Sequence, residues 1–285
     1  MGIVMRKVVY LLTIGFLVSS ILSFMLFPKE ALADGGPPNL AYVAGAVHGI
    51  SVIDIAKQKV TNTFAVAGDP QTVLLSIDGR LLYVAEPSLK RVEVIATATK
   101  KMLCMAAFPG HPTLLTLDPG TNTLYLAGDD AQVVEALDPL SCKIRHTVTT
   151  SCAVGGIAVA VVGSGISGGN GNQLWVTTSD AVDVFDSSGK QLATVPIAGG
   201  PQYLTIPPGT MVYVTTRQGT VDAIDLGSRK VLQGLLTGGI YGPMDYDAIT
   251  GEVYVPDERQ HRLDVLPQSL QPQYLFNMSQ FKSYI

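Results

Sequence analysis

The chain has 285 residues, of which 47% are hydrophobic and 15% charged, and its formal net charge is −4 at pH 7. An acidic balance works against binding to a phosphate backbone, which needs clustered Lys and Arg. The composition therefore gives no reason to expect a nucleic-acid partner, and the length allows one or two domains.

The first 33 residues are typical of a secretory signal peptide. Arg6 and Lys7 precede an uncharged stretch over 8–27, and a small-x-small cleavage site ends at Ala33. The alternative is an uncleaved anchor, because about 20 apolar residues can span a bilayer. In either case we expect a secreted or extracytoplasmic protein, at the cell surface or in the periplasm. Its only expected membrane contact is an uncleaved leader.

Cleavage after Ala33 would leave a single domain over 34–285. It would remove three positive residues and one negative residue, so the formal charge would become about −6, from the −4 of the whole chain.

The segment over 70–103 predicts a four-stranded antiparallel unit. Short apolar runs rich in Val, Ile, Leu and Tyr alternate with turn residues such as Asp78-Gly79. Breaks of this length join only antiparallel neighbours. Because Leu82, Tyr83 and Val84 alternate in direction and are all apolar, we expect both faces of the sheet to be buried.

This unit recurs along the chain. Its second run has an aromatic residue followed by Val or Leu in six copies, at Tyr42, Tyr83, Tyr125, Trp175, Tyr213 and Tyr254. The steps between them are 41, 42, 50, 38 and 41 residues. A period near forty with four strands per repeat predicts the blades of a β-propeller. No segment after Ala33 has the 3.6-residue periodicity of a helix.

The stretch over 68–101 resembles the YVTN-type β-propeller repeat of YncE-like and surface-layer-associated exported proteins. It carries Gly-x-Pro, an Asp-Gly turn, Tyr-Val-Ala, Val-x-Val-Ile and a final Lys, and related copies cover nearly all of 34–285. The resemblance implies an all-β propeller of four-stranded antiparallel blades, usually seven in number. It does not fix an activity, since propellers include lactonases, dehydrogenases and binding modules.

The sequence leaves the closure of the ring open, because only six copies are visible. In one alternative the C-terminal tail supplies the missing first strand of a six-bladed ring. In the other, which we favour, the protein is of a seven-bladed type with a truncated or degenerate last blade.

The three cysteines raise the question of a disulfide in an exported protein. Ten residues of extended chain separate Cys142 from Cys152 and span roughly 30 Å, whereas a disulfide needs a Cα separation of about 4.4–6.8 Å. We place Cys104 in a fourth strand and expect no disulfide, each cysteine being a small core or surface residue.

Two recurring features predict architectural roles. Pro70, Pro112, Pro201 and Pro243 each open a blade, where no strand hydrogen bond is needed. An Asp at the end of the third strand, at Asp54, Asp138, Asp186 and Asp225, should cap the following turn with its side chain.

In a propeller, the turns between strands two and three share one face with the links from strand four to the next strand one. This face surrounds the mouth of the central channel. We therefore predict ligand-binding side chains at His48, Asp69, Glu86, His111, Asp129, Arg217, Tyr241 and Asp257. The same face receives Asp130, Cys152, Ser179, Asp180, Gln202, Glu258 and Arg259. The alternative for each residue is that turns are polar because they are solvated.

Two functions from different classes fit these features. The first is an exported, non-catalytic binding or interaction scaffold whose partner is a protein, a glycan or a small polar ligand. The alternative is a lactonase-like hydrolase of a sugar lactone or ester, with His111, Glu86, His48 and Arg217 as base and oxyanion stabiliser. No His-x-x-x-His or paired-Cys spacing is present, so we expect no metal and no other cofactor.

Overall fold

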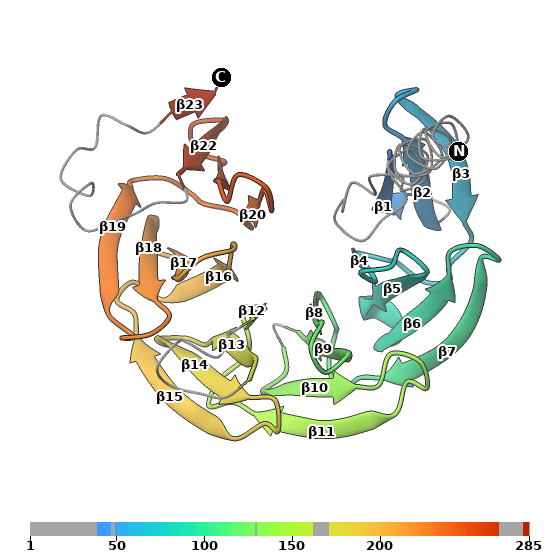
Figure 1. Cartoon of the computed structure of the whole chain (residues 1–285), viewed down its shortest axis with the longest axis horizontal. Coiled ribbons are helices and arrows are strands. Elements are labelled where there is room, and N and C mark those ends of the chain that lie inside the picture. The colour runs from blue at the N-terminus through green and yellow to red at the C-terminus, as the bar shows by residue number, and fades with distance from the viewer. Residues whose placement is uncertain (1–38, 47–48, 129, 162–170, 268–281, 285) are drawn as a thin grey trace, which may run out of the picture. The chain divides into compact units, whose positions relative to one another are not determined.

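The computed structural model describes residues 39–46, 49–128, 130–161, 171–267 and 282–284, all within the unit that spans 34–285. These residues form β-strands and one short 3-10 helix, Pro87–Leu89, arranged as six antiparallel sheets (Figure 1). The all-β propeller fold is therefore confirmed. In the described ranges no helix is long and apolar enough to cross a membrane. The predicted leader, residues 1–33, lies outside these ranges.

The sheets follow chain order, and their strands have the following bounds. The first sheet contains β1 (Leu40–Ala46), β2 (Gly49–Asp54) and β3 (Lys59–Phe64). The second contains β4 (Thr72–Leu75), β5 (Leu81–Glu86), β6 (Arg91–Ala96) and β7 (Lys101–Ala107). The third contains β8 (Leu114–Asp118), β9 (Thr123–Ala127), β10 (Val133–Leu137) and β11 (Ile144–Thr149).

The fourth sheet contains β12 (Gly156–Ala160), β13 (Gln173–Thr177), β14 (Ala181–Asp186) and β15 (Gln191–Pro196). The fifth contains β16 (Pro201–Thr205), β17 (Met211–Thr216), β18 (Thr220–Asp225) and β19 (Val231–Thr237). The sixth contains β20 (Asp245–Tyr246), β21 (Val253–Asp257), β22 (Arg262–Leu266) and β23 (Lys282–Tyr284).

The core lies between consecutive sheets, which pack face to face. Figure 1 shows β4, β8, β12 and β16 on the inner side and β7, β11, β15 and β19 on the outer side. The recurring aromatics Tyr83, Tyr125, Trp175 and Tyr213 are at most 2% exposed. In the second to fifth sheets, apolar residues on both faces of the second and third strands are buried with them, as the sequence predicts.

The turns between the third and fourth strands are built alike. Asp54, Asp138, Asp186 and Asp225 each accept a backbone N–H of the following turn, which confirms their predicted capping role. In five sheets the pairing of the third and fourth strands shifts register, and in four of these the shift lies near the connecting turn. Such a bulge increases the local twist of the outer strand.

A buried acidic side chain recurs in the third strand of five sheets. This feature was not predicted from the sequence. The residues are Glu93, Glu135, Asp183, Asp222 and Asp264, all at most 7% exposed. Four of them have partners, such as Arg91 for Glu93 and Thr194 for Asp183. Glu135 differs, because its Oε2 is buried with no hydrogen-bond partner, and burial raises its pKa.

Six blades are present in the described residues, and a seventh blade is not among them. The first sheet has three strands there, which correspond to strands two to four of a full blade. The tail strand β23 pairs with β22 as the outer strand of the sixth sheet. The tail therefore does not supply the missing first strand of the first sheet.

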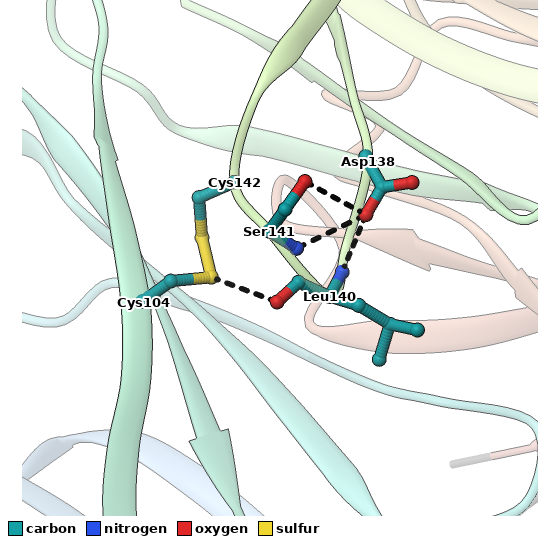
Figure 2. Close-up of a disulfide and its surroundings, with 5 residues drawn as sticks. All are labelled: Cys104, Asp138, Leu140, Ser141 and Cys142. Atoms are coloured by element: carbon teal, nitrogen blue, oxygen red, sulfur yellow. Dashed lines mark hydrogen bonds between the residues drawn. A yellow bond between two sulfur atoms is a disulfide. The ribbon is translucent and has the colours of Figure 1, made fainter.

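The expectation of no disulfide is wrong, because Cys104 and Cys142 are bonded (Figure 2). Cys104 lies in β7, as predicted. Cys142 lies in the turn between β10 and β11, at a positive φ of 55°, where it faces the outer strand of the preceding sheet. The two Cα atoms are 5.8 Å apart although 38 residues separate them in sequence. Cys152 is free. The bond joins neighbouring blades across space, so the reach of the chain between the two cysteines does not limit it.

Candidate functional site

A cavity of about 590 Å³ lies where the inner strands β4, β8 and β16 meet the segments that lead into β12 and β20. Residues from the second to the sixth sheet line it: Gln71, Thr72, Thr113, Leu114, Leu115, Val154, Gly155, Gln202, Tyr203, Arg217 and Pro243. Its volume is in the range of small-molecule sites, which are a few hundred cubic ångströms or more.

The lining residues occupy equivalent places in successive blades. Gln71, Thr113 and Gln202 each follow the proline that opens a blade, and Thr72 and Tyr203 come one position later. The proline fixes the backbone where the chain enters the inner strand, so the next side chains reach the cavity. The prolines thus stand at the start of their blades, and the residues directly after three of them supply part of the cavity lining.

Arg217 is the only charged residue among those that line the cavity. It lies in the turn between β17 and β18, and its backbone N–H donates to the carbonyl of Gly200 at 2.8 Å. Its guanidinium lies over the same glycine, since a Cβ added there would be 3.4 Å from Nη1. In the described part of the chain no carboxylate lies within ion-pair distance of this guanidinium.

Neutral polar groups and an apolar wall complete the cavity. The hydroxyl hydrogen of Thr72 is already used, since it is donated to the carbonyl of Thr113 at 2.7 Å. The side chains of Thr113, Gln202 and Tyr203 make no hydrogen bond within the described residues, so they retain capacity for a ligand. Val154 is buried and Leu115 half-buried in the wall between them.

The rim of the same face is held by a contact that repeats from sheet to sheet. In each of five sheets the link before strand one bonds to the turn between strands two and three. The pairs are Ser88 N–H to Asp69, His111 N–H to Asp130, Ser179 hydroxyl to Cys152, Arg217 N–H to Gly200, and Ile240 N–H to Asp257. Several polar residues of this face are therefore used to join loops.

His111 and Asp130 form the most distinctive of these pairs. Nδ1 of His111 lies 2.5 Å from an oxygen of Asp130, and both side chains are partly exposed. The backbone hydrogen bond from His111, followed by the contact with its ring, lowers the pKa of Asp130. Two glycines make room for the pair. A Cβ at Gly110 would lie 2.4 Å from Asp130 Oδ1, and a Cβ at Gly128 would lie 2.1 Å from the His111 carbonyl oxygen.

Three predicted ligand residues are buried instead. Glu86 is 0% exposed, forms an ion pair with Arg91, and has a pKa raised by burial. Tyr241 and Asp257, at 4% and 1% exposed, are joined by a single β-bridge. The Oδ1 atom of Asp257 accepts backbone N–H groups of its own turn, including that of Arg259 at 3.0 Å.

The remaining predicted residues have different positions. Arg217 lines the cavity, His111 lies at the rim, and Asp69 is exposed with its pKa lowered by hydrogen bonds from Ser88. His48 and Asp129 lie outside the described residues. Within the described ranges, no group of three or more His, Cys, Asp or Glu side chains could hold a metal ion.

Comparison with known proteins gives the fold and no family. No family model and no curated protein matches the sequence. A solved structure from Kuenenia stuttgartiensis, hydrazine synthase, is similar with a TM-score of 0.69 and 18% sequence identity. The match covers 88% of this chain and 85% of that one. At this identity the likeness shows a shared propeller fold only.

Proposed function

We propose that this chain is an exported, non-catalytic β-propeller that binds a small polar ligand in the cavity at its channel face. The observation that carries the proposal is the 590 Å³ cavity, in which separate blades contribute polar side chains that make no hydrogen bond within the described residues. Concave sites with an apolar wall and a few convergent polar groups are the usual form of small-molecule sites. A protein or glycan partner would use the same face through its rim.

Export is supported by two independent features. The first is the leader pattern over 1–33, with its positive flank and small-x-small site. The second is the disulfide between Cys104 and Cys142, because disulfides persist in oxidising compartments and are rare in the cytosol. We also propose membership of the YVTN-type repeat family, and a ring of the seven-bladed type, on the repeat pattern and on the three strands of the first sheet.

Binding at the channel can be tested with a soak and a filled variant. Crystals of the exported protein would be soaked with a mixture of small neutral and charged polar compounds, and affinities for the hits measured in solution. We expect density in the cavity, and we expect Thr113→Trp, which fills it, to abolish binding. Thr63→Trp, at an exposed position of the outer strand β3, is the control. Hits confined to other surfaces, or affinity unchanged by Thr113→Trp, would refute the proposal.

A lactonase-like hydrolase is the second candidate, and the pair of His111 and Asp130 favours it. A neutral imidazole that donates Nδ1–H to Asp130 keeps the lone pair of Nε2 available as a general base. We prefer the binding scaffold, because a contact between the same two loops recurs in five sheets and the His111–Asp130 pair is the example in the third sheet. Hydrolysis of a lactone panel by the protein, lost in His111→Asn and retained in His261→Asn, would favour the enzyme.

A further inference from the structure

We propose that the ligand of the channel cavity is a small monoanionic carboxylate whose charge is held by Arg217. This inference rests on the proposed function and names its ligand class. It follows from the charge, the position and the neighbours of one guanidinium.

The charge of the lining selects an anion. Arg217 carries the only formal charge there, and no Asp or Glu belongs to the lining. The chain as a whole has a net charge of −4, so the positive charge of this cavity is opposite in sign to the charge of the whole chain. An arginine presents a planar fork of donors that matches a carboxylate in two parallel hydrogen bonds.

The position of the guanidinium is built into the loop. The backbone N–H of Arg217 donates to the carbonyl of Gly200, and the side chain passes over that glycine where it lines the cavity. A side chain at Gly200 would crowd this path, because its Cβ would also be 3.8 Å from Arg217 Cδ and the glycine has a φ of +73°. The guanidinium therefore lies at the cavity, and its donors are not used by another side chain among the described residues.

The residues that line the cavity beside Arg217 indicate a ligand with one negative charge and an apolar body. Gln202, Tyr203 and Thr113 offer neutral donors and acceptors, which can satisfy a carboxylate oxygen or a hydroxyl. Leu115 and Val154 add apolar surface to the same lining. A dianion such as a phosphate monoester would keep one charge without a partner against this wall, which is unfavourable.

Three probes of nearly equal shape test the ligand class. Benzoate carries one charge, benzamide carries none, and phenyl phosphate carries close to two. Their dissociation constants would be measured by calorimetry or ligand-observed NMR on the exported protein at low ionic strength, and their positions by crystal soaks. We expect benzoate to bind on the order of tenfold to a hundredfold more tightly than benzamide, the usual range for a charged hydrogen bond.

Variants assign that preference to one residue. Arg217→Gln should remove the advantage of benzoate over benzamide, and Arg217→Lys should keep part of it, since the charge stays but the fork is lost. Arg259→Gln is the matched control, because Arg259 is an exposed residue in the equivalent turn of the sixth sheet and does not line the cavity. Unchanged thermal unfolding of each variant would show that the fold is intact.

Several results would overturn the inference. Equal affinity for benzoate and benzamide, tighter binding of phenyl phosphate, or a benzoate preference that survives Arg217→Gln would each exclude the assigned ligand class. If neutral compounds still occupied the cavity in those crystals, binding at the channel would stand and only the anion would be wrong. If no compound occupied the cavity, both proposals would fail.

Discussion

The disulfide between Cys104 and Cys142 should stabilise the protein strongly. It closes a loop over a sequence separation of 38 residues and joins the outer parts of the second and third sheets. For a loop of this size the lost entropy of the unfolded chain corresponds to about 4 kcal/mol at 25 °C. At roughly 2–4 °C per kcal/mol for a domain of this size, the melting temperature should fall by roughly 8–16 °C on removal.

The test is equilibrium urea unfolding of Cys104→Ser/Cys142→Ser beside the native protein. Trp175, the only tryptophan of the chain, is 0% exposed and so reports unfolding by fluorescence. Cys152→Ser is the matched control, because this cysteine is free and belongs to the neighbouring link. Reducing agent should destabilise the native protein and the control alike and leave the double variant unchanged.

The reasoning would be refuted by a double variant that unfolds at the same urea concentration as the control. Thiol titration gives a second, independent check. The denatured, unreduced protein should show one reactive thiol, and three reactive thiols would show that the bond does not form.

Three further predictions follow from buried groups and close contacts. Glu135→Gln should raise stability by about 1–3 kcal/mol near neutral pH, the usual cost of an unpaired buried polar group, in urea melts compared with Glu258→Gln at an exposed position. Burial raises the pKa of Glu135, so the contribution of this side chain to the stability of the fold is fully present below its ordinary pKa of 4.5 and is lost as pH rises through the raised value. The stability advantage of Glu135→Gln should therefore vanish in acid. An advantage that stays constant with pH would contradict this. Burial lowers the pKa of His146, whose Nε2 has no partner, so stability should fall as pH drops below the ordinary value of 6.5, and melts of His146→Gln should lack that fall. Gly128→Ala should cost roughly 1–3 kcal/mol by forcing the His111 carbonyl away, and an unchanged melting temperature would show that the loop yields freely.

The sequence alone determined the fold class, because a propeller blade is a local unit. Its four strands are adjacent in sequence, so apolar runs, Asp-Gly turns and a period near forty specify it without long-range information. The Asp caps at Asp138 and its equivalents were predictable for the same reason, since each bonds to its own turn. Arg217 could be placed on the correct face, because the blade frame fixes which turns lie there.

Only the tertiary structure decided which residues meet between blades. Cys104 and Cys142 lie 5.8 Å apart because the turn between β10 and β11 meets the outer strand β7 of the preceding sheet, and no local pattern encodes that distance. Glu86 and Asp257 are buried as the last residues of β5 and β21, whereas Arg217 lies in the turn after β17 and lines the cavity, and the repeat pattern alone did not separate these two cases. The cavity itself is lined by segments of five sheets that are far apart in the sequence, so no single repeat encodes it.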